Sequence, residues 1–282
     1  MNPLLNKYEE LTYSSLSEVS QQNGAHVFAK VRLADVFPIT GSGLSDADYS
    51  FALKSHFDFI VTDRAYNPLF AVEFDGPLHR DQRQKERDHR KDSLSDRFHF
   101  PLLRINSNYI DRQFRGLDLL TYFVEVWFMS VAFDEAQARG DVPYDEFFDP
   151  ALIIMDPNRK ERWPYWLSVD LQIRLQKLAE SGRIHDYIPS HWIGTDREGT
   201  YRCLAWLDFT ADSYIIVETG MRAQRFPVVI PDILSQIAIF DLCEELARVF
   251  AGATEPESRH VLDELRRFYQ KNFKMCSSAS HG

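Results

Sequence analysis

Three carboxylates lie close together in the most apolar part of the N-terminal half, within HFDFIVTDRAYNPLFAVEFDGPLH at residues 56–79. Asp58 is inside the first apolar run, and Glu73 and Asp75 are two residues apart in the second. Alternate residues of a strand share a face, so the latter two are expected on one face. Carboxylates that converge from adjacent strands suit Mg²⁺ or Mn²⁺, which stabilise charge on a phosphoryl group and activate water. The pattern favours a metal-dependent nuclease with Asp58, Glu73 and Asp75 as metal ligands.

A simpler interpretation of these acids stays open. Acidic residues are also common on strands as the solvent-facing members of an alternating pattern. Asp63, at the end of the first apolar run, is expected to be one of these. A short motif alone cannot decide between the two interpretations.

Elements of the N-terminal half are expected to form a mixed sheet flanked by helices, an α/β fold. The helices and the polar loop follow from apolar spacing and from turn residues. In chain order we expect a helix at 3–22, a strand at 26–34, a loop or short helix at 38–50, two strands within 56–75, a helix at 80–97, a strand at 101–106 and a helix at 116–138.

The ordered motifs of this half resemble the restriction-endonuclease-like superfamily, the PD-(D/E)XK nucleases. They are most similar to a bacterial branch of poorly characterised members related to very-short-patch-repair endonucleases. The motifs are Asp58-Phe59, Glu73-Phe74-Asp75-Gly76-Pro77-Leu78-His79, Arg87-Asp88, Lys91-Asp92 and Leu102-Leu103-Arg104-Ile105. The resemblance covers roughly residues 3–130. It implies an endonuclease-like fold, a phosphodiester hydrolase that uses Mg²⁺ or Mn²⁺, and a DNA substrate met in repair or phage defence. It also implies a supporting role for Glu9, which lies on the first helix where the superfamily often has an acid.

One position departs from the superfamily pattern, because Asp75 stands where a lysine would orient or polarise the attacking water. Lys91, on the following helix, is the first candidate for a relocated cation, and Lys85 is the second. His79 is the other candidate, either as a general base or as a partner of Asp75. The alternatives are that Lys91 is a solvated helix residue paired with a neighbouring aspartate and that His79 caps the next helix.

The formal net charge of −10 opposes nucleic-acid binding, which usually shows a basic footprint. Binding depends on the local field, however, and residues 80–97 contain seven Lys or Arg against five acids. Candidate phosphate contacts on this helix are Arg80, Arg83, Arg87 and Arg90. The alternative is an ordinary solvated helix of mixed charge.

The domains are expected at 1–138 for the nuclease-like part and at 151–275 for a smaller α+β accessory part, with a linker at 139–150 and a disordered tail at 276–282. Within the accessory part we expect a helix at 160–182, a β-hairpin at 201–220 and helices at 232–251 and 256–273. Its role is open, and it could carry a homodimer contact or a protein partner. Aromatics there, Trp163, Trp166, Trp192 and Trp206, allow base stacking but are more typical of a core.

Composition sets the remaining bounds. A chain of 282 residues with 44% hydrophobic content can bury a substantial core. Three scattered cysteines without a CxxC pair argue against a disulfide framework or structural zinc and for a reducing cytoplasm. No apolar run reaches the length of a membrane span, and the N-terminus lacks a signal pattern.

The leading hypothesis assigns a role to each candidate residue. Asp58 and Glu73 would bind the metal with the Phe74 carbonyl, Glu9 would act through a water, and Lys91 would stabilise the transition state. Asp58 or Glu73 could then be removed without collapse of the fold. Two alternatives remain: an inactive nuclease-fold module that binds nucleic acid, and a protein whose acidic surface contacts another protein.

Overall fold

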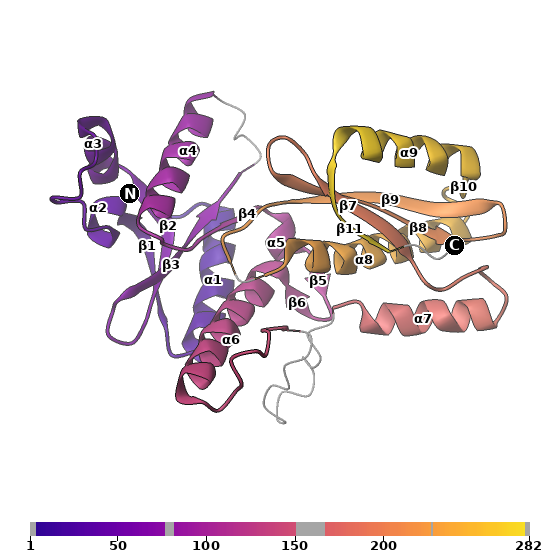
Figure 1. Cartoon of the computed structure of the whole chain (residues 1–282), viewed down its shortest axis with the longest axis horizontal. Coiled ribbons are helices and arrows are strands. Elements are labelled where there is room, and N and C mark those ends of the chain that lie inside the picture. The colour runs from indigo at the N-terminus through magenta and orange to yellow at the C-terminus, as the bar shows by residue number, and fades with distance from the viewer. Residues whose placement is uncertain (1–3, 77–81, 151–166, 227, 280–282) are drawn as a thin grey trace. The chain divides into compact units, whose positions relative to one another are not determined.

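The computed structural model describes residues 4–76, 82–150, 167–226 and 228–279 (Figure 1). The chain divides into two compact units. The first unit is Met1–Phe148 with Gln224–Val228, and the second is Asp149–Ala223 with Val229–Gly282. In the described ranges, no helix has the length and apolarity needed to cross a bilayer.

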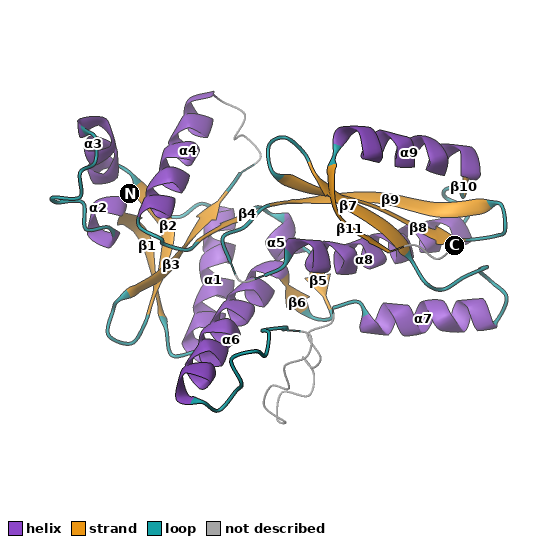
Figure 2. Cartoon of the chain, in the orientation of Figure 1, coloured by secondary structure: helices purple, strands orange, loops and turns teal. Residues whose placement is uncertain are grey.

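The first unit is built on a mixed four-stranded sheet of order β1-β2-β3-β4 (Figure 2). Pairs β1/β2 and β2/β3 are antiparallel and β3/β4 is parallel, which confirms the expected fold class. The strands are β1 (His26–Arg32), β2 (His56–Thr62), β3 (Pro68–Phe74) and β4 (Leu102–Ile105), with the short pair β5 (Gln113–Phe114) and β6 (Leu117–Asp118) apart from them. The helices are α1 (Lys7–Gln22), α2 (Leu33–Val36), α3 (Asp46–Lys54), α4 (Gln82–Arg97), α5 (Asn108–Asp111) and α6 (Leu119–Arg139).

Strands β2 and β3 are mainly apolar, and most side chains on both of their faces are buried. Ala71 belongs to a core cluster with Leu33 of α2 and Leu94 of α4. Its neighbour Phe70, which alternation places on the other face, packs against Trp127 of α6 with ring centroids 4.8 Å apart. The sheet is therefore a middle layer, and a polar side chain on β2 or β3 needs a specific partner.

The second unit contains a five-stranded antiparallel sheet of order β10-β9-β8-β7-β11. Its strands are β7 (Ser190–Thr195), β8 (Thr200–Asp208), β9 (Ser213–Arg222), β10 (Glu257–Ser258) and β11 (Lys274–Ala279), and its helices are α7 (Val169–Glu180), α8 (Ile230–Phe250) and α9 (Arg259–Asn272). The hairpin expected at 201–220 is confirmed by β8 and β9. The helices expected at 232–251 and 256–273 correspond to α8 and α9.

One expectation for the second unit changes. Residues 276–279, expected in a disordered tail, belong to β11, which pairs with β7 and satisfies the main-chain groups of that strand. The core role favoured for Trp192 and Trp206 is confirmed, since Trp206 belongs to a core cluster, Trp192 packs against it edge to face, and Arg266 lies 4.6 Å from the Trp192 ring centroid. Residues 151–166, with Trp163 and Trp166, lie outside the described residues.

A short segment after β9 completes the first unit. The Gln224 side chain accepts from the Arg104 N–H at 3.0 Å and donates to the Arg104 carbonyl at 2.7 Å, as a neighbouring strand would. Phe226 packs edge to face on Phe70, with centroids 5.2 Å apart. The edge of β4 and part of the core thus depend on residues far along the sequence.

We expect Phe226→Ala to destabilise the first unit by about 3–5 kcal/mol, because it removes a buried ring from beside Phe70. Hydrogen exchange of the β3 and α6 amides measures this locally. Phe147→Ala is the matched control, because that ring is 89% exposed, and its effect should stay within about 0.5 kcal/mol. Equal protection in the two variants would contradict the assignment of Phe226 to the core of the first unit.

Candidate active site

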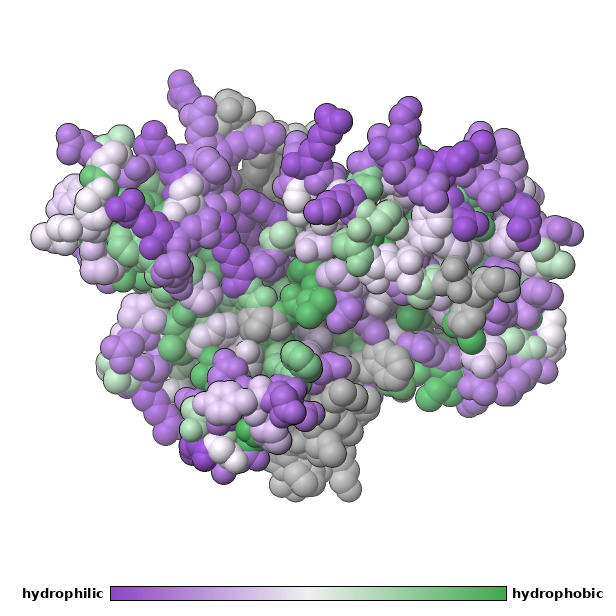
Figure 3. Space-filling view, in the orientation of Figure 1, coloured by the Kyte–Doolittle hydropathy of each residue, from purple (hydrophilic) through white to green (hydrophobic). Residues whose placement is uncertain are grey.

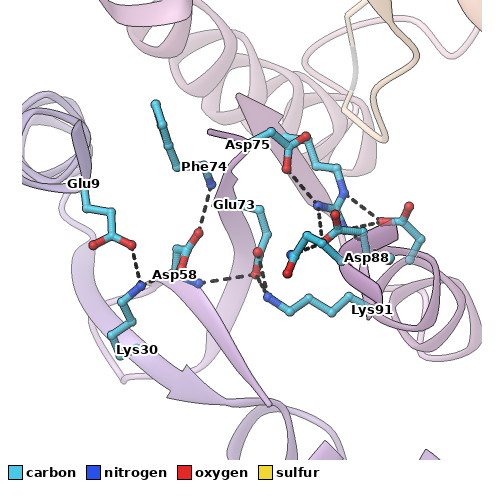
Figure 4. A network of polar contacts seen from close by, with 11 residues as sticks. Glu9, Lys30, Asp58, Glu73, Phe74, Asp75, Asp88 and Lys91 are labelled. Atoms are coloured by element: carbon cyan, nitrogen blue, oxygen red, sulfur yellow. Dashed lines mark hydrogen bonds and ion pairs between the residues drawn. The ribbon is translucent and has the colours of Figure 1, made fainter. Parts of the chain in front are cut away.

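A pocket of about 620 Å³ opens in the first unit among α1, β1, β2, β3 and α4. It is here called the acidic pocket, after its three carboxylates Glu9, Asp58 and Glu73. It gathers charged residues that are far apart in the sequence, namely Glu9, Lys30, Asp58, Glu73 and Lys91 (Figure 4). Three of the five were expected to bind or support a metal ion, and Lys91 was expected as a cation. The structure therefore brings four of the six sequence-predicted catalytic residues, Glu9, Asp58, Glu73 and Lys91, to one place.

Asp58 and Glu73 face each other across the β2/β3 pair. The register Phe59↔Val72 continues to these two positions, and residues opposite one another on antiparallel strands share a face. The Phe74 N–H donates to Asp58 Oδ2 at 3.0 Å, and the Asp58 N–H donates to Glu73 Oε1 at 3.3 Å. Each carboxylate is thus held by the backbone of the strand that carries the other.

Glu73 forms a buried ion pair with Lys91. The ammonium lies 2.7 Å from both carboxylate oxygens, with Glu73 only 4% exposed and Lys91 7% exposed. Lys91 is directed inward because Leu94, one helical turn later, is anchored in the core. Burial raises the pKa of Glu73 to about 7, the Lys91 ammonium opposes this rise, and the charge of Asp58 adds to it. Lys91 is therefore not the solvated helix residue of the alternative interpretation.

Lys30 is the residue of this pocket that the sequence analysis missed. Its ammonium lies 2.6 Å from Glu9 Oε1 and 2.7 Å from Asp58 Oδ1, and it bridges the two acids. Burial lowers the pKa of Lys30, but the hydrogen bonds that its ammonium donates to Asp58 and Glu9, together with their negative charges, outweigh this effect, so the net shift is upward. Its backbone φ is +56°, a conformation that side chains rarely adopt and that clusters at functional sites. Lys30 lies opposite Asp58 in the β1/β2 register. The sequence alone does not give this register, so it carried no signal that could have identified Lys30.

Glu9 is positioned by the start of α1. The Asn6 side chain accepts from the Glu9 N–H at 3.0 Å, and Glu9 Oε2 accepts from the Asn6 N–H at 2.9 Å, forming a capping box. Its other oxygen remains for Lys30. Tyr8 stacks on Phe74, with centroids 5.4 Å apart, and fixes this turn against β3. The acid expected on the first helix therefore does point into the pocket.

Asp75 is directed away from the other two predicted ligands. Its Oδ1 accepts from Arg104 at 3.1 Å, and the same buried guanidinium donates to Asp92 Oδ1 at 2.9 Å and to the Asp88 carbonyl at 3.1 Å. Asp75 does not border the acidic pocket. The possibility that Asp75 holds His79 concerns residues 77–81, which lie outside the described residues.

The exposed cations of α4 differ in their distance from the pocket. Arg87 borders it, whereas Arg90 lies 5.8 Å from the Phe51 ring centroid. Arg83, Lys85, Arg87 and Arg90 are all exposed, and hydrophilic side chains gather over α4 in Figure 3. Arg80 lies outside the described residues. This face can meet phosphates, although Lys85 does not reach the pocket as a replacement for the missing lysine.

Glu9, Asp58 and Glu73 supply hard carboxylate oxygens, the donor type that Mg²⁺ and Mn²⁺ prefer. Each of the three is paired with a lysine, and over the described ranges no three His, Cys, Asp or Glu residues are grouped so as to hold a metal as they stand. The donors fit a divalent ion by their chemistry. Such an ion would compete with the Lys30 ammonium for Glu9 and Asp58.

Comparison with known proteins gives one match. Residues 1–116 match a family described as "Protein of unknown function (DUF2726)". No curated protein and no solved structure matches the chain. The matched range contains all the charged residues of the acidic pocket, and the description of the family assigns no activity to them.

The two central acids should differ in their effect on stability. Glu73→Gln leaves the Lys91 ammonium buried without its counter-charge and should cost about 3–5 kcal/mol of the free energy of unfolding. Asp58→Asn should cost less than about 1 kcal/mol, because the half-exposed Lys30 keeps Glu9. Urea unfolding of both variants measures the difference.

The double variant Glu73→Gln/Lys91→Met is the control for this pair. It removes both charges and should recover most of the loss. Similar, mild losses in Glu73→Gln and Asp58→Asn would mean that the buried pair contributes little.

Proposed function

We propose that the first unit is a metal-dependent nuclease that hydrolyses phosphodiester bonds, with DNA as its substrate. The observation that supports this most is the pairing of Asp58 and Glu73 across adjacent strands. The buried ammonium of Lys91 contacts Glu73, and the ammonium of Lys30, which also contacts Glu9, contacts Asp58. Buried charge is costly and is retained mainly where it is used, so such a pocket in the middle of an apolar sheet favours chemistry over stability.

Asp58 and Glu73 would hold Mg²⁺ or Mn²⁺, together with the carbonyl of Phe74. When bound, the ion supplies charge for the developing phosphorane and lowers the pKa of a water. The chain holds the two carboxylates in place beforehand through the hydrogen bonds from Phe74 and Asp58. Glu73 must be deprotonated to act as a ligand, which its pKa of about 7 allows at and above neutral pH.

The two lysines have separate tasks in this proposal. Lys91 holds the Glu73 carboxylate at 2.7 Å and is placed to orient the nucleophile beside it. Lys30 is less buried, since 38% of its side chain is accessible, and it can turn from Glu9 and Asp58 to a phosphate oxygen. Arg87, at the border of the pocket, would contact a neighbouring phosphate.

A second candidate function is a nuclease-fold module that binds nucleic acid or a protein without cleaving. One observation favours it: each of the three acids of the pocket already has a lysine partner, Lys30 for Glu9 and Asp58 and Lys91 for Glu73. In that case the ion pairs are structural, and divalent ions would leave the protein unchanged.

We expect the protein to cleave DNA with Mg²⁺ or Mn²⁺ and not with EDTA, and Asp58→Asn to reduce the rate by at least about a hundredfold because an essential ligand is lost. Linear, circular and single-stranded DNA are incubated with each metal. Asp141→Asn, an exposed acid on the same unit, is the matched control and should cut normally. Absence of cutting with retained DNA binding would support the non-catalytic module, and cutting that survives in Asp58→Asn would place the site elsewhere.

Binding of Mn²⁺ should become stronger as the pH rises from 6 to 8. Glu73 is largely protonated below its pKa of about 7 and must lose this proton to bind the ion, so the affinity should change by up to about tenfold per pH unit and level off above the pKa. Calorimetric titration of the protein with Mn²⁺ measures this. A flat profile over that range would contradict the role of Glu73 as a ligand.

A further inference from the structure

A second pocket of the first unit, here called the aromatic pocket, has a volume of about 780 Å³. It is lined by residues of α1, of the start of β1 and of the turn that joins β2 to β3. Its most prominent side chains are those of Tyr13, His26, Phe28, Arg64 and Tyr66. None of these residues takes part in the chemistry proposed for the acidic pocket.

Tyr66 is an aromatic ring presented to solvent. It is 65% exposed, and it stacks on His26 with ring centroids 5.1 Å apart and an interplanar angle of 14°. Phe28, also exposed, lies 6.1 Å from the Tyr66 ring at 60°. Stacked rings at the surface offer a flat face to a further planar group, and every nucleobase has such a face.

The position of Tyr66 is maintained against backbone strain. Its φ is +66°, which costs a non-glycine residue on the order of 1–3 kcal/mol. The turn is held by Asp63, whose Oδ1 accepts from the N–H groups of Ala65 and Asn67 at 2.8 Å each. A strained backbone that keeps an aromatic ring in solvent contributes nothing to the core, so a ligand is the better explanation of its placement.

The charge around the aromatic pocket suits a phosphate backbone. Its lining contains Arg64 and His26 and no carboxylate, although the whole chain has a net charge of −10. Arg64 lies over Gly24, where a Cβ would be only 2.6 Å from its Nε, so the absence of a side chain at Gly24 makes room for the guanidinium. Across the described ranges no acid forms an ion pair with Arg64, and the nearby Asp63 is engaged in the turn.

The aromatic pocket and the acidic pocket border the same two elements. His26, Phe28 and Lys30 are alternate residues of β1, so Lys30 and His26 are about 13 Å apart along the strand. On α1, Glu9 belongs to one pocket and Tyr13 to the other, one helical turn or about 6 Å away. One strand of a duplex advances about 3.4 Å per nucleotide and an unpaired strand can extend further, so a strand whose phosphate is in the acidic pocket would reach Tyr66 within a few nucleotides.

We propose that the aromatic pocket binds single-stranded nucleic acid, with a base stacked on Tyr66 and a phosphate on Arg64, on the strand that continues to the acidic pocket. The continuation rests on the proposed nuclease function, whereas the binding does not. Bases in a duplex are already stacked on each other, so their faces are not available to Tyr66. The substrate would then contain an unpaired stretch beside the bond to be cut.

Fluorescence anisotropy with a labelled single-stranded DNA oligonucleotide tests this, in EDTA so that no cleavage occurs. Tyr66→Ala should weaken binding by about five- to 150-fold, and Tyr66→Phe should restore it because the ring is kept. Arg64→Ala should lower the slope of log affinity against log salt by about 0.7, as one phosphate contact is lost. The matched controls are Tyr144→Ala, which removes an 81% exposed ring of the same unit, and Arg139→Ala. Both should bind as wild type, and thermal melts check that all variants are folded.

Each outcome decides one of the two proposals. Single-strand affinity that is absent, or equal in wild type and Tyr66→Ala, overturns the aromatic pocket as a binding site. The proposal is also overturned if a duplex of the same sequence binds with the same affinity and loses the same factor of affinity on Tyr66→Ala.

Tyr66-dependent binding without metal-dependent cleavage would support the binding site and reject the nuclease. Cleavage of duplex DNA that is indifferent to Tyr66 would support the nuclease and reject the continuation of the bound strand from the aromatic pocket to the acidic pocket. An RNA oligonucleotide of the same sequence shows which sugar is preferred.

Discussion

The arrangement of the first unit depends on the ion pair between Glu73 and Lys91. Glu73 lies on a strand whose two faces are covered, where an unpaired carboxylate would be strongly unfavourable. The ammonium of Lys91 offsets the cost of burying the Glu73 carboxylate, and it does so only because α4 places this ammonium 2.7 Å from the carboxylate. Leu94 in the core fixes the same helix, so packing and electrostatics require one position of α4. The Glu73–Lys91 pair thereby fixes the position of α4 beside the acidic pocket, although buried ion pairs in general often add no net stability over well-packed apolar residues of similar size.

Neighbouring charges follow the same rule of local compensation. Arg104, buried on β4, is shared among Asp75, Asp92 and the Asp88 carbonyl, and Lys30 is shared between Glu9 and Asp58. The net charge of −10 is therefore a poor guide to the field inside the pockets. The acidic pocket is lined by four Lys or Arg side chains and three carboxylates, and the aromatic pocket has a cation without a lining acid.

Two residues that line these pockets have a strained backbone, and one is charged and the other aromatic. Lys30 and Tyr66 have φ values of +56° and +66°. Each is held by carboxylates, Lys30 through its own ammonium and Tyr66 through the Asp63 turn. The matched family range of residues 1–116 includes both of them but not Gln224, which completes the edge of β4. The first unit of this chain therefore uses more of the sequence than the matched range.

The sequence by itself determined the features that depend on neighbours along the chain. Apolar runs indicated β2 and β3 and put Asp58 and Glu73 on them, and the turn residues indicated the hairpin of β8 and β9. These signals are local, because periodicity and turn chemistry are properties of a few consecutive residues. Only the tertiary structure decided which charges meet. Lys30 joins the site through the β1/β2 register, Asp75 leaves it for Arg104, and the segment after β9 returns to β4. Which charged residues form ion pairs depends on their distance in the folded structure. The apolar pattern of a single strand gives no information about that distance.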